Sequence, residues 1–209
     1  YGGLPFYFNG TVEKNGKTYS KLVNFDDPET TLMLMREEDA RVYVLFDDDF
    51  INRYHIYLYD RPELKDTDFM IYDFNLKKGD TFETLISCKL MPYDDDHLEI
   101  ETRQVGEVTT IDINGHKLRV QQLLEEDGGD TPLFWDDKVI EGFGPYSYSD
   151  WFFANYVAPT GDYFYSKNEF GSVTDKNTDE VLINVEMVKQ ALRAVGVHDV
   201  QEENVAAGD

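Results

Sequence analysis

Carboxylates are the side chains of this 209-residue chain best suited to chemistry, first of all to metal binding. There are 42 Asp and Glu residues, many of them in short clusters. Calcium takes about six to eight oxygen ligands that converge from a tight loop. The stretch Glu125-Glu126-Asp127-Gly128-Gly129-Asp130 comes nearest, since its glycines let carbonyls turn inward between Asp127 and Asp130. It lacks EF-hand spacing, so solvated loop charge is the favoured interpretation and calcium the alternative. We expect weak calcium binding or none, and no other cofactor.

General acid–base catalysis is a second use for paired carboxylates. Asp73 and Asp80 lie in the block Tyr72-Asp73-Phe74-Asn75-Leu76-Lys77-Lys78-Gly79-Asp80-Thr81. Aspartates beside a turn also bond their own backbone as Asx turns, and such turns are far more abundant than catalytic pairs. The favoured interpretation is therefore structural, with a catalytic pair as the alternative.

Sequence motifs of nucleophilic or transition-metal chemistry are absent. The chain contains neither Gly-x-Ser-x-Gly nor Asp-Thr-Gly. Cys88 is the single cysteine, and the four histidines (His55, His97, His116 and His198) show no zinc-ligand spacing. Cys88 therefore indicates a buried, inert thiol, and no catalytic residue is assigned. Glycoside hydrolysis needs only two carboxylates, so a carboxylate-dependent glycan hydrolase stays open as an alternative function.

Aromatic residues suggest a binding surface instead. They crowd between residues 134 and 165, and Tyr146, Tyr148, Trp151 and Tyr156 alternate there with polar residues on the loop 142–161. Rings with polar handles suit recognition of sugars and peptides, and loops on a rigid sheet are common binding sites. We expect most of the aromatic cluster to pack in the core. Those four residues are the predicted ligand-binding site.

Charge limits the partners. The 19 basic residues leave a formal net charge of −23, which repels phosphate backbones and excludes nucleic acid as the expected partner. A neutral or cationic glycan, peptide or protein is expected instead. No apolar run approaches the about 20 residues of a membrane helix, so no membrane insertion is expected.

Short strand-like runs dominate the chain and are bounded by turn residues. The pairs Asn15-Gly16 and Asn114-Gly115 lie between such runs and predict two-residue type I′ hairpins, whose central residues need positive φ. The predicted strands cover 17–23, 31–36, 41–46, 54–59, 69–74, 81–87, 98–105, 108–113 and 117–124. The sequence predicts an all-β or strongly β-dominated fold, an antiparallel hairpin-built sandwich or open barrel with a C-terminal helix.

The C-terminal helix is predicted by an apolar stripe with helical spacing over 181–195. Asn184 is the expected N-cap and Gly196 the expected C′ residue, so the helix should cover 185–195 and follow a strand over 180–184. We expect a single β-rich domain over 1–200, with two lobes meeting about residue 106 as the alternative, and a flexible tail over 201–209.

A series of motifs resembles a known set of proteins. The series is Asn-Gly-Lys-Thr-Tyr-Ser-Lys-Leu (15–22), Met-Arg-Glu-Glu (35–38), Arg-Val-Tyr-Val (41–44), the Tyr-Asp-Phe block at 72–81 and Val-Ile-Glu-Gly-Phe-Gly (139–144). It resembles largely uncharacterised secreted or cell-surface proteins of Bacteroidetes over residues 10–175. The chain departs from them in Gly-Phe-Gly-Pro-Tyr, where Gly-Ile-Gly-Ser is usual, and in an insertion at about 47–68.

The resemblance implies a β-rich, extracytoplasmic protein whose export signal has been removed, and it supplies no catalytic residues. Together with the aromatic loop, it favours a non-enzymatic binding or surface-assembly module of unknown ligand. The glycan hydrolase is the first alternative. A protease inhibitor or pro-segment is the second, and would need a protruding loop, for which 145–161 is the candidate.

Overall fold

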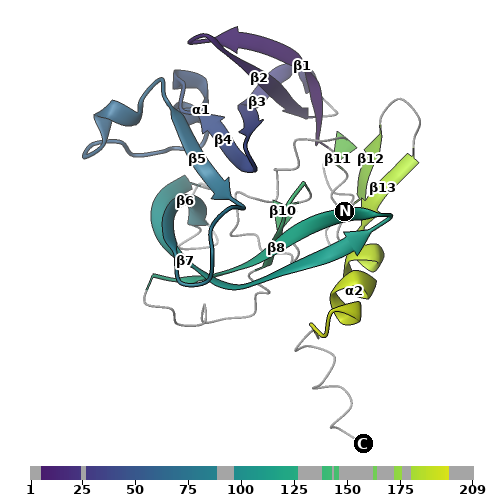
Figure 1. Cartoon of the computed structure of the whole chain (residues 1–209). Helices are drawn as coiled ribbons and strands as arrows, with labels where there is room; N and C mark the ends of the chain where they lie inside the picture. Colours follow the sequence, from purple (N-terminus) through teal and green to yellow (C-terminus); the bar gives the residue numbers. More distant parts are fainter. Residues whose placement is uncertain are drawn as a thin grey trace, which may run out of the picture.

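Two antiparallel sheets make up most of the molecule, as the computed structural model shows (Figure 1). The structure describes residues 6–24, 27–88, 97–126, 138–142, 144–145, 162–163, 172–175 and 180–197. Strands dominate this part of the chain, a helix lies near its C-terminal end, and the sheets do not close into a barrel within it. The predicted fold class is confirmed.

The larger sheet is built on a meander of neighbouring strands. Its order is β13-β12-β11-β1-β2-β3-β4-β5, so five consecutive strands lie side by side and the last three join at the open edge of β1. The strands are β1 (Phe6–Lys14), β2 (Lys17–Asn24), β3 (Asp27–Glu38), β4 (Arg41–Leu45), β5 (Asp68–Asp73), β11 (Asp162–Tyr163), β12 (Ser172–Asp175) and β13 (Glu180–Asn184).

The smaller sheet is also a meander, with the order β10-β9-β8-β7-β6. Its long central hairpin of β7 and β8 extends beneath the first sheet in Figure 1. Its strands are β6 (Thr81–Cys88), β7 (His97–Ile113), β8 (His116–Glu125), β9 (Lys138–Ile140) and β10 (Gly144–Pro145).

Both Asn-Gly turns have the predicted conformation. Asn15 and Gly16 have φ of 53° and 73°, and Asn114 and Gly115 have φ of 54° and 82°. Positive φ at both central positions is what a type I′ turn requires, and its twist matches that of the flanking strands. The two hairpin predictions are confirmed.

A third turn with positive φ joins β3 to β4 without any glycine. Asp39 and Ala40 have φ of 51° and 57°. Their carbonyls accept hydrogen bonds from the turn that follows β5: Asn75 Nδ2 donates to Asp39 O (2.6 Å) and Phe74 N to Ala40 O (2.9 Å). Tertiary contacts therefore hold a backbone shape that alanine disfavours on its own.

One core joins the two sheets. Its main cluster contains buried residues from both, among them Met35, Val44, Leu85 and Leu123. At the junction Thr84 of β6 donates its hydroxyl to the carbonyl of Ile71 in β5 (2.8 Å). Residue 106, the boundary of the two-lobed alternative, lies inside β7, where the register against β8 shifts between Val105 and Val108.

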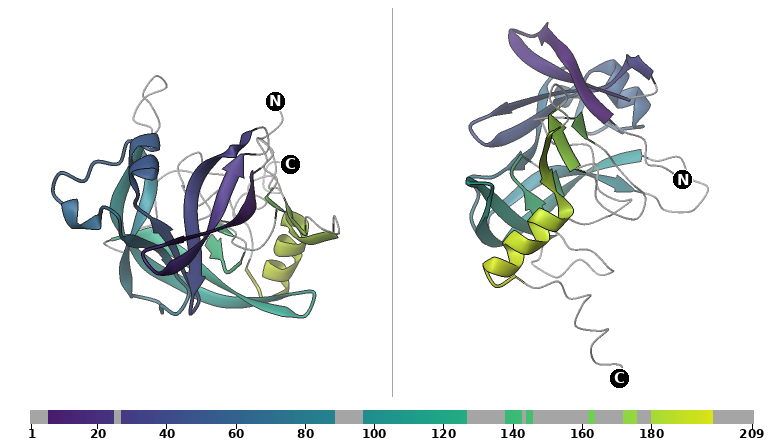
Figure 2. Two further views of the ribbon diagram at one scale, coloured as in Figure 1. Left: turned by 90° about the horizontal axis from the view of Figure 1, so that it is seen from above. Right: turned by 90° about the vertical axis from the view of Figure 1, so that its right-hand side faces the viewer.

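The C-terminal helix α2 (Val185–Ala194) packs on the smaller sheet (Figure 2). The side chain of Asn184 accepts a hydrogen bond from Met187 N (2.9 Å), and Gly196 has φ of 82°. These are the N-cap and the C′ glycine that the sequence predicts. Val188 and Leu192 are buried and belong to the same apolar cluster as sheet residues of β7, β8 and β9.

The strand predicted over 54–59 is wrong. The chain instead forms helix α1 (Asp48–Arg53), an irregular stretch, and the 3-10 helix η1 (Pro62–Leu64). Asp47 caps α1 by accepting a hydrogen bond from Phe50 N (2.9 Å), and two aspartates follow in the first turn. Acidic residues favour a helix N-terminus, so this acidic cluster is a helix start.

Candidate functional site

The irregular stretch after α1 presents two exposed tyrosines on a buried base. Ile56 is buried and Leu58 packs against the main core cluster, whereas Tyr57 and Tyr59 are 65% and 86% exposed. Aliphatic and aromatic residues therefore alternate between the core and the solvent. This alternation is typical of a strand, and it is present here although residues 54–59 do not form one.

The two exposed rings stack on each other. Their centroids are 5.9 Å apart and their planes differ by 11°, an offset parallel arrangement. Among the described residues, the exposed large hydrophobic side chains are these two and Val195, which lies after α2. We call Tyr57 and Tyr59 together the tyrosine surface. It is the candidate functional site within the described part of the chain.

The segment that carries the tyrosine surface is tied to both neighbouring elements. Arg61 N donates to Leu58 O (3.2 Å), and the Arg61 guanidinium forms an ion pair with Glu83 of β6 (2.8 Å from Nη1 to Oε1). At its other end, Leu98 N of β7 donates to Tyr54 O (3.0 Å). These contacts hold the stretch between 54 and 61 against the smaller sheet. The blue loop that contains it lies at the periphery in both Figure 1 and Figure 2.

The segment that carries the tyrosine surface is acidic. Residues 47–68 contain seven acidic and three basic residues, a net charge of −4. Two of the three cations are engaged within the segment or with β6: Lys65 pairs with Asp48 (2.7 Å), and Arg61 pairs with Glu63 as well as Glu83. Asp49 and Asp60 are exposed, and no ion pair joins either of them to a basic side chain in the described ranges. A cationic ligand would find unmatched carboxylates here.

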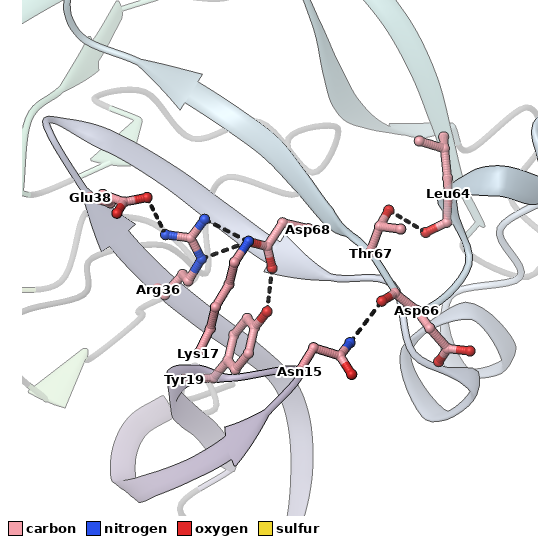
Figure 3. A network of polar contacts seen from close by, with 9 residues as sticks. All are labelled: Asn15, Lys17, Tyr19, Arg36, Glu38, Leu64, Asp66, Thr67 and Asp68. Carbon is pink, nitrogen blue, oxygen red and sulfur yellow. Dashed lines mark hydrogen bonds and ion pairs between the residues drawn. The ribbon is translucent and has the colours of Figure 1, made fainter.

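The carboxylate of Asp68 has a structural role (Figure 3). It accepts from Lys17 Nζ (2.6 Å), Arg36 Nε (2.7 Å) and the hydroxyl of Tyr19. Burial alone would raise the pKa of Asp68, but these three donors hold it below its ordinary value. Burial, followed by the hydrogen bond to Asp68, raises the pKa of Tyr19 to about 12.

This network also fixes the loop that leads into β5. Asn15 Nδ2, in the first hairpin turn, donates to Asp66 O (2.9 Å), and Thr67 Oγ1 donates to Leu64 O (2.7 Å), as Figure 3 shows. The first hairpin and the loop before β5 are therefore held together by polar contacts beside Asp68.

Asp73 is the Asx turn that the sequence favours. Its Oδ1 accepts from Asn75 N (2.8 Å) and its Oδ2 from Arg41 Nε (2.7 Å). The side chain of Asp80 also accepts a backbone hydrogen bond, but from a residue that precedes it in the chain: Lys77 N donates to Asp80 Oδ2 (2.8 Å). Both carboxylates are engaged in shaping the link between the two sheets, which supports the structural interpretation of the Tyr-Asp-Phe block.

A different carboxylate pair arises where the sheets meet. Glu37, near the end of β3, is an exposed residue whose pKa is raised, first by partial burial of its carboxyl group and second by the charge of Glu141. Glu141 follows β9, and its Oε2 accepts from Arg119 N (3.1 Å). Two carboxylates in unlike surroundings resemble the acid and base of a hydrolase. Sequence spacing gave no sign of this pair, which is 104 positions apart.

The predicted ligand-binding residues Tyr146, Tyr148, Trp151 and Tyr156 lie outside the described residues, as do the calcium candidates Asp127 and Asp130. Those predictions stay open. Within the described ranges, no group of three or more His, Cys, Asp or Glu side chains is arranged to hold a metal ion. No helix there is long and apolar enough to cross a membrane.

The sequence did contain a signal for the tyrosine surface. Ile56-Tyr57-Leu58-Tyr59 alternates strictly, and a strand with one wet face would also have exposed the two tyrosines. The predicted ligand-binding residues lie instead in the denser aromatic cluster downstream. The register of β6 against β7 also sets Cys88 opposite His97, a relationship that spacing alone did not indicate.

Comparisons with protein-family models, with curated proteins and with solved structures found no match. The residues and their geometry are therefore the basis for inferring a function.

Proposed function

We propose that this chain is a non-enzymatic, extracytoplasmic binding module and that the tyrosine surface contacts its ligand. The observation that carries the proposal is the parallel pair of exposed rings, Tyr57 and Tyr59, above the buried Ile56 and Leu58. A stacked, exposed aromatic pair contributes little to the core of its own protein. It offers a partner a large, preorganised contact area instead.

Tyrosine suits such a role for physical reasons. Its ring provides apolar area with only two side-chain torsions to immobilise, and its hydroxyl remains able to bond a partner or water. Here the backbone beneath is anchored by Leu58 and Arg61, so little ordering is required on binding. Preorganised rings lose less entropy in a complex than rings on an unanchored loop.

The carboxylates at the two ends of β5, the edge strand of the larger sheet, support a non-enzymatic role. Asp68 accepts from three side-chain donors, and both oxygens of Asp73 are engaged by Arg41 and Asn75. A general acid or base must be able to reach a substrate proton. These two carboxylates are occupied with holding strands together.

Location and partner are parts of the same proposal. The motif series at 15–22, 35–38 and 72–81 supports a secreted or cell-surface protein. The net charge of −23 supports a neutral or cationic glycan, peptide or protein partner over nucleic acid.

Fractionation of cells that make the full-length gene product, followed by immunoblotting, tests the location. Recovery in the cytoplasmic fraction alone would contradict it.

The test of the binding role compares the parent protein with the double variant Tyr57→Ser and Tyr59→Ser on glycan and peptide arrays. Both side chains are exposed, so the variant should keep its fold. Val195→Ser removes exposed apolar area elsewhere and serves as the matched control. We expect the tyrosine variant to lose binding and the control to keep it. Equal binding by parent and tyrosine variant would refute the proposed site.

A third arm of that experiment examines the loop predicted from sequence. The variant Tyr148→Ala with Trp151→Ala is read on the same arrays. Loss of binding in this variant alone would place the ligand at the loop 142–161. Loss in both double variants would indicate one site that includes both regions.

The glycan hydrolase remains a second candidate because of Glu37 and Glu141. The raised pKa of Glu37 suits a proton donor, and Glu141, which accepts a hydrogen bond from Arg119 N, is the second carboxylate of the pair. The test is release of reducing sugar from a polysaccharide panel by the parent and by Glu37→Gln. Activity that Glu37→Gln abolishes would make the protein an enzyme and overturn the non-enzymatic proposal.

A further inference from the structure

We infer that the tyrosine surface takes arginine side chains from a basic protein partner. This inference rests on the proposed function, because it names the partner of the same site. Three features carry it: the parallel rings of Tyr57 and Tyr59, the net charge of −4 over residues 47–68, and the prior engagement of nearby cations by carboxylates of this chain.

The open ring face is the first feature. Tyr59 is 86% exposed, so the ring face turned away from Tyr57 is accessible to a partner. A guanidinium is planar and weakly hydrated, and it stacks on aromatic faces better than an ammonium does. It would extend the existing parallel stack by one layer. The chain itself contains such a contact, because the Arg36 guanidinium lies 4.1 Å from the centroid of the Tyr43 ring.

The carboxylates are the second feature. Asp60 directly follows Tyr59, and Asp49 lies in the first turn of α1; both are exposed. An arginine stacked on the ring could donate to a carboxylate from its edge, as Arg36 does within the protein: it lies over Tyr43 while it bonds Asp68 and Glu38. That internal arrangement combines a tyrosine face with two carboxylates. At the tyrosine surface Asp60 directly follows Tyr59 in the chain, and no basic residue of the described ranges is paired with Asp60 or Asp49.

The third feature separates a basic partner from the alternatives. Arg61 and Lys65 are already in ion pairs, so they do not neutralise Asp49 or Asp60. An anionic ligand would be repelled by this segment and by the whole chain at −23. A neutral saccharide could stack on Tyr59 but would gain nothing from the excess charge. A polypeptide with exposed arginines matches both the rings and the carboxylates.

The experiment measures binding of fluorescent peptides to the folded full chain by anisotropy, at about 150 mM salt to screen long-range attraction. The probes are three nine-residue peptides of one design, Gly-Ser repeats with three arginines, three lysines or three citrullines. We expect the arginine peptide to bind best, the lysine peptide more weakly, and the uncharged citrulline peptide not at all.

Variants assign the binding to residues. Tyr57→Ser with Tyr59→Ser should weaken the arginine peptide about 5- to 30-fold, as loss of a partly desolvated cation–π contact implies. Tyr57→Phe with Tyr59→Phe keeps both ring faces and should bind like the parent. Asp49→Asn with Asp60→Asn should weaken binding and reduce its salt dependence, whereas Val195→Ser should change neither.

The outcomes separate this inference from the proposal beneath it. If the serine variant binds the arginine peptide as the parent does, the inference is wrong. If that variant nonetheless loses an array ligand such as a saccharide, the tyrosine surface is a binding site and only the partner class is wrong. If neither array ligands nor peptides depend on the tyrosines, the proposed function at this site fails as well.

Discussion

Gln121 of β8 donates its side-chain amide to the backbone carbonyl of Asp73 at the end of β5, over 3.0 Å. The same Nε2 lies 3.2 Å from the carbonyl of Leu76. Gln121 is buried, with 1% of its surface exposed, and it joins the smaller sheet to the larger one. A single amide thus satisfies two carbonyls in the link that connects the sheets.

Replacing Gln121 with Leu should destabilise the protein. The leucine keeps the volume but leaves both carbonyls without this donor, which costs about 1 to 2 kcal/mol in a buried position. Urea denaturation measures the loss in the free energy of unfolding. Gln190→Leu, at an exposed position of α2, is the control and should change stability by less than about 0.5 kcal/mol. Equal effects of the two substitutions would contradict the role assigned to Gln121.

Tyr19 should make the protein sensitive to alkali. Its pKa rises from 10.0 to about 12 in the folded protein, so folding favours the neutral phenol. That contribution to stability is complete below the unfolded pKa of about 10 and is lost as the pH rises toward about 12. Denaturation series between those pH values should show a steeper loss of stability in the parent than in Tyr19→Phe. Parallel curves for the two proteins would rule out this linkage.

Ala40 should accept glycine with a gain in stability. Its φ of 57° is strained for an L-residue, and glycine removes that strain. The greater freedom of glycine in the unfolded chain offsets part of the gain, so the net increase in the free energy of unfolding should be about 0.5 to 1 kcal/mol. The opposite substitution at the matched turn, Gly16→Ala, should cost about 1 to 2 kcal/mol. No atom lies within 4 Å of the added Cβ at Gly16, so that cost would be conformational. Thermal melts of both variants check the two signs.

Gly106→Ala should destabilise for a steric reason. A Cβ there would lie 2.8 Å from Gln122 Oε1 and 3.0 Å from Leu124 Cδ1. Forcing an extra carbon into such a site typically costs about 1 to 3 kcal/mol. Adding Gln122→Ala removes one of the two clashes and should restore part of the lost stability. A double variant no more stable than Gly106→Ala alone would show that Gln122 yields without cost and that Leu124 sets the penalty.

Turns and helix ends were predictable because their signals are local. Asn15-Gly16 needs positive φ whatever surrounds it, and Asn184 and Gly196 mark the ends of α2 by their own chemistry. The Asp39–Ala40 turn was not predictable in this way. Its conformation is held by donors from Phe74 and Asn75, which are more than 30 residues away.

The tyrosine surface shows why a correct pattern can yield a wrong element. Ile56 and Leu58 face inward and Tyr57 and Tyr59 outward, as a half-buried strand would arrange them. Alternation records which face is buried, whereas strand pairing depends on a neighbour that the sequence does not name. The proximity of Glu37 and Glu141 was not predictable for the same reason, since Glu37 belongs to the larger sheet and Glu141 follows β9 of the smaller one.

The pairing of β1 with the late strand β11 has a consequence for biosynthesis. β1 to β5 are consecutive in the chain and can pair as soon as residue 73 has been made, but at the other edge of β1 its first residue, Phe6, pairs with Tyr163 of β11. Those partners are 157 residues apart. During vectorial synthesis the start of β1 therefore lacks this partner until the last fifth of the chain has been made. That interval is when the nascent protein is most open to strand exchange with another copy, and when a holding chaperone would protect it most.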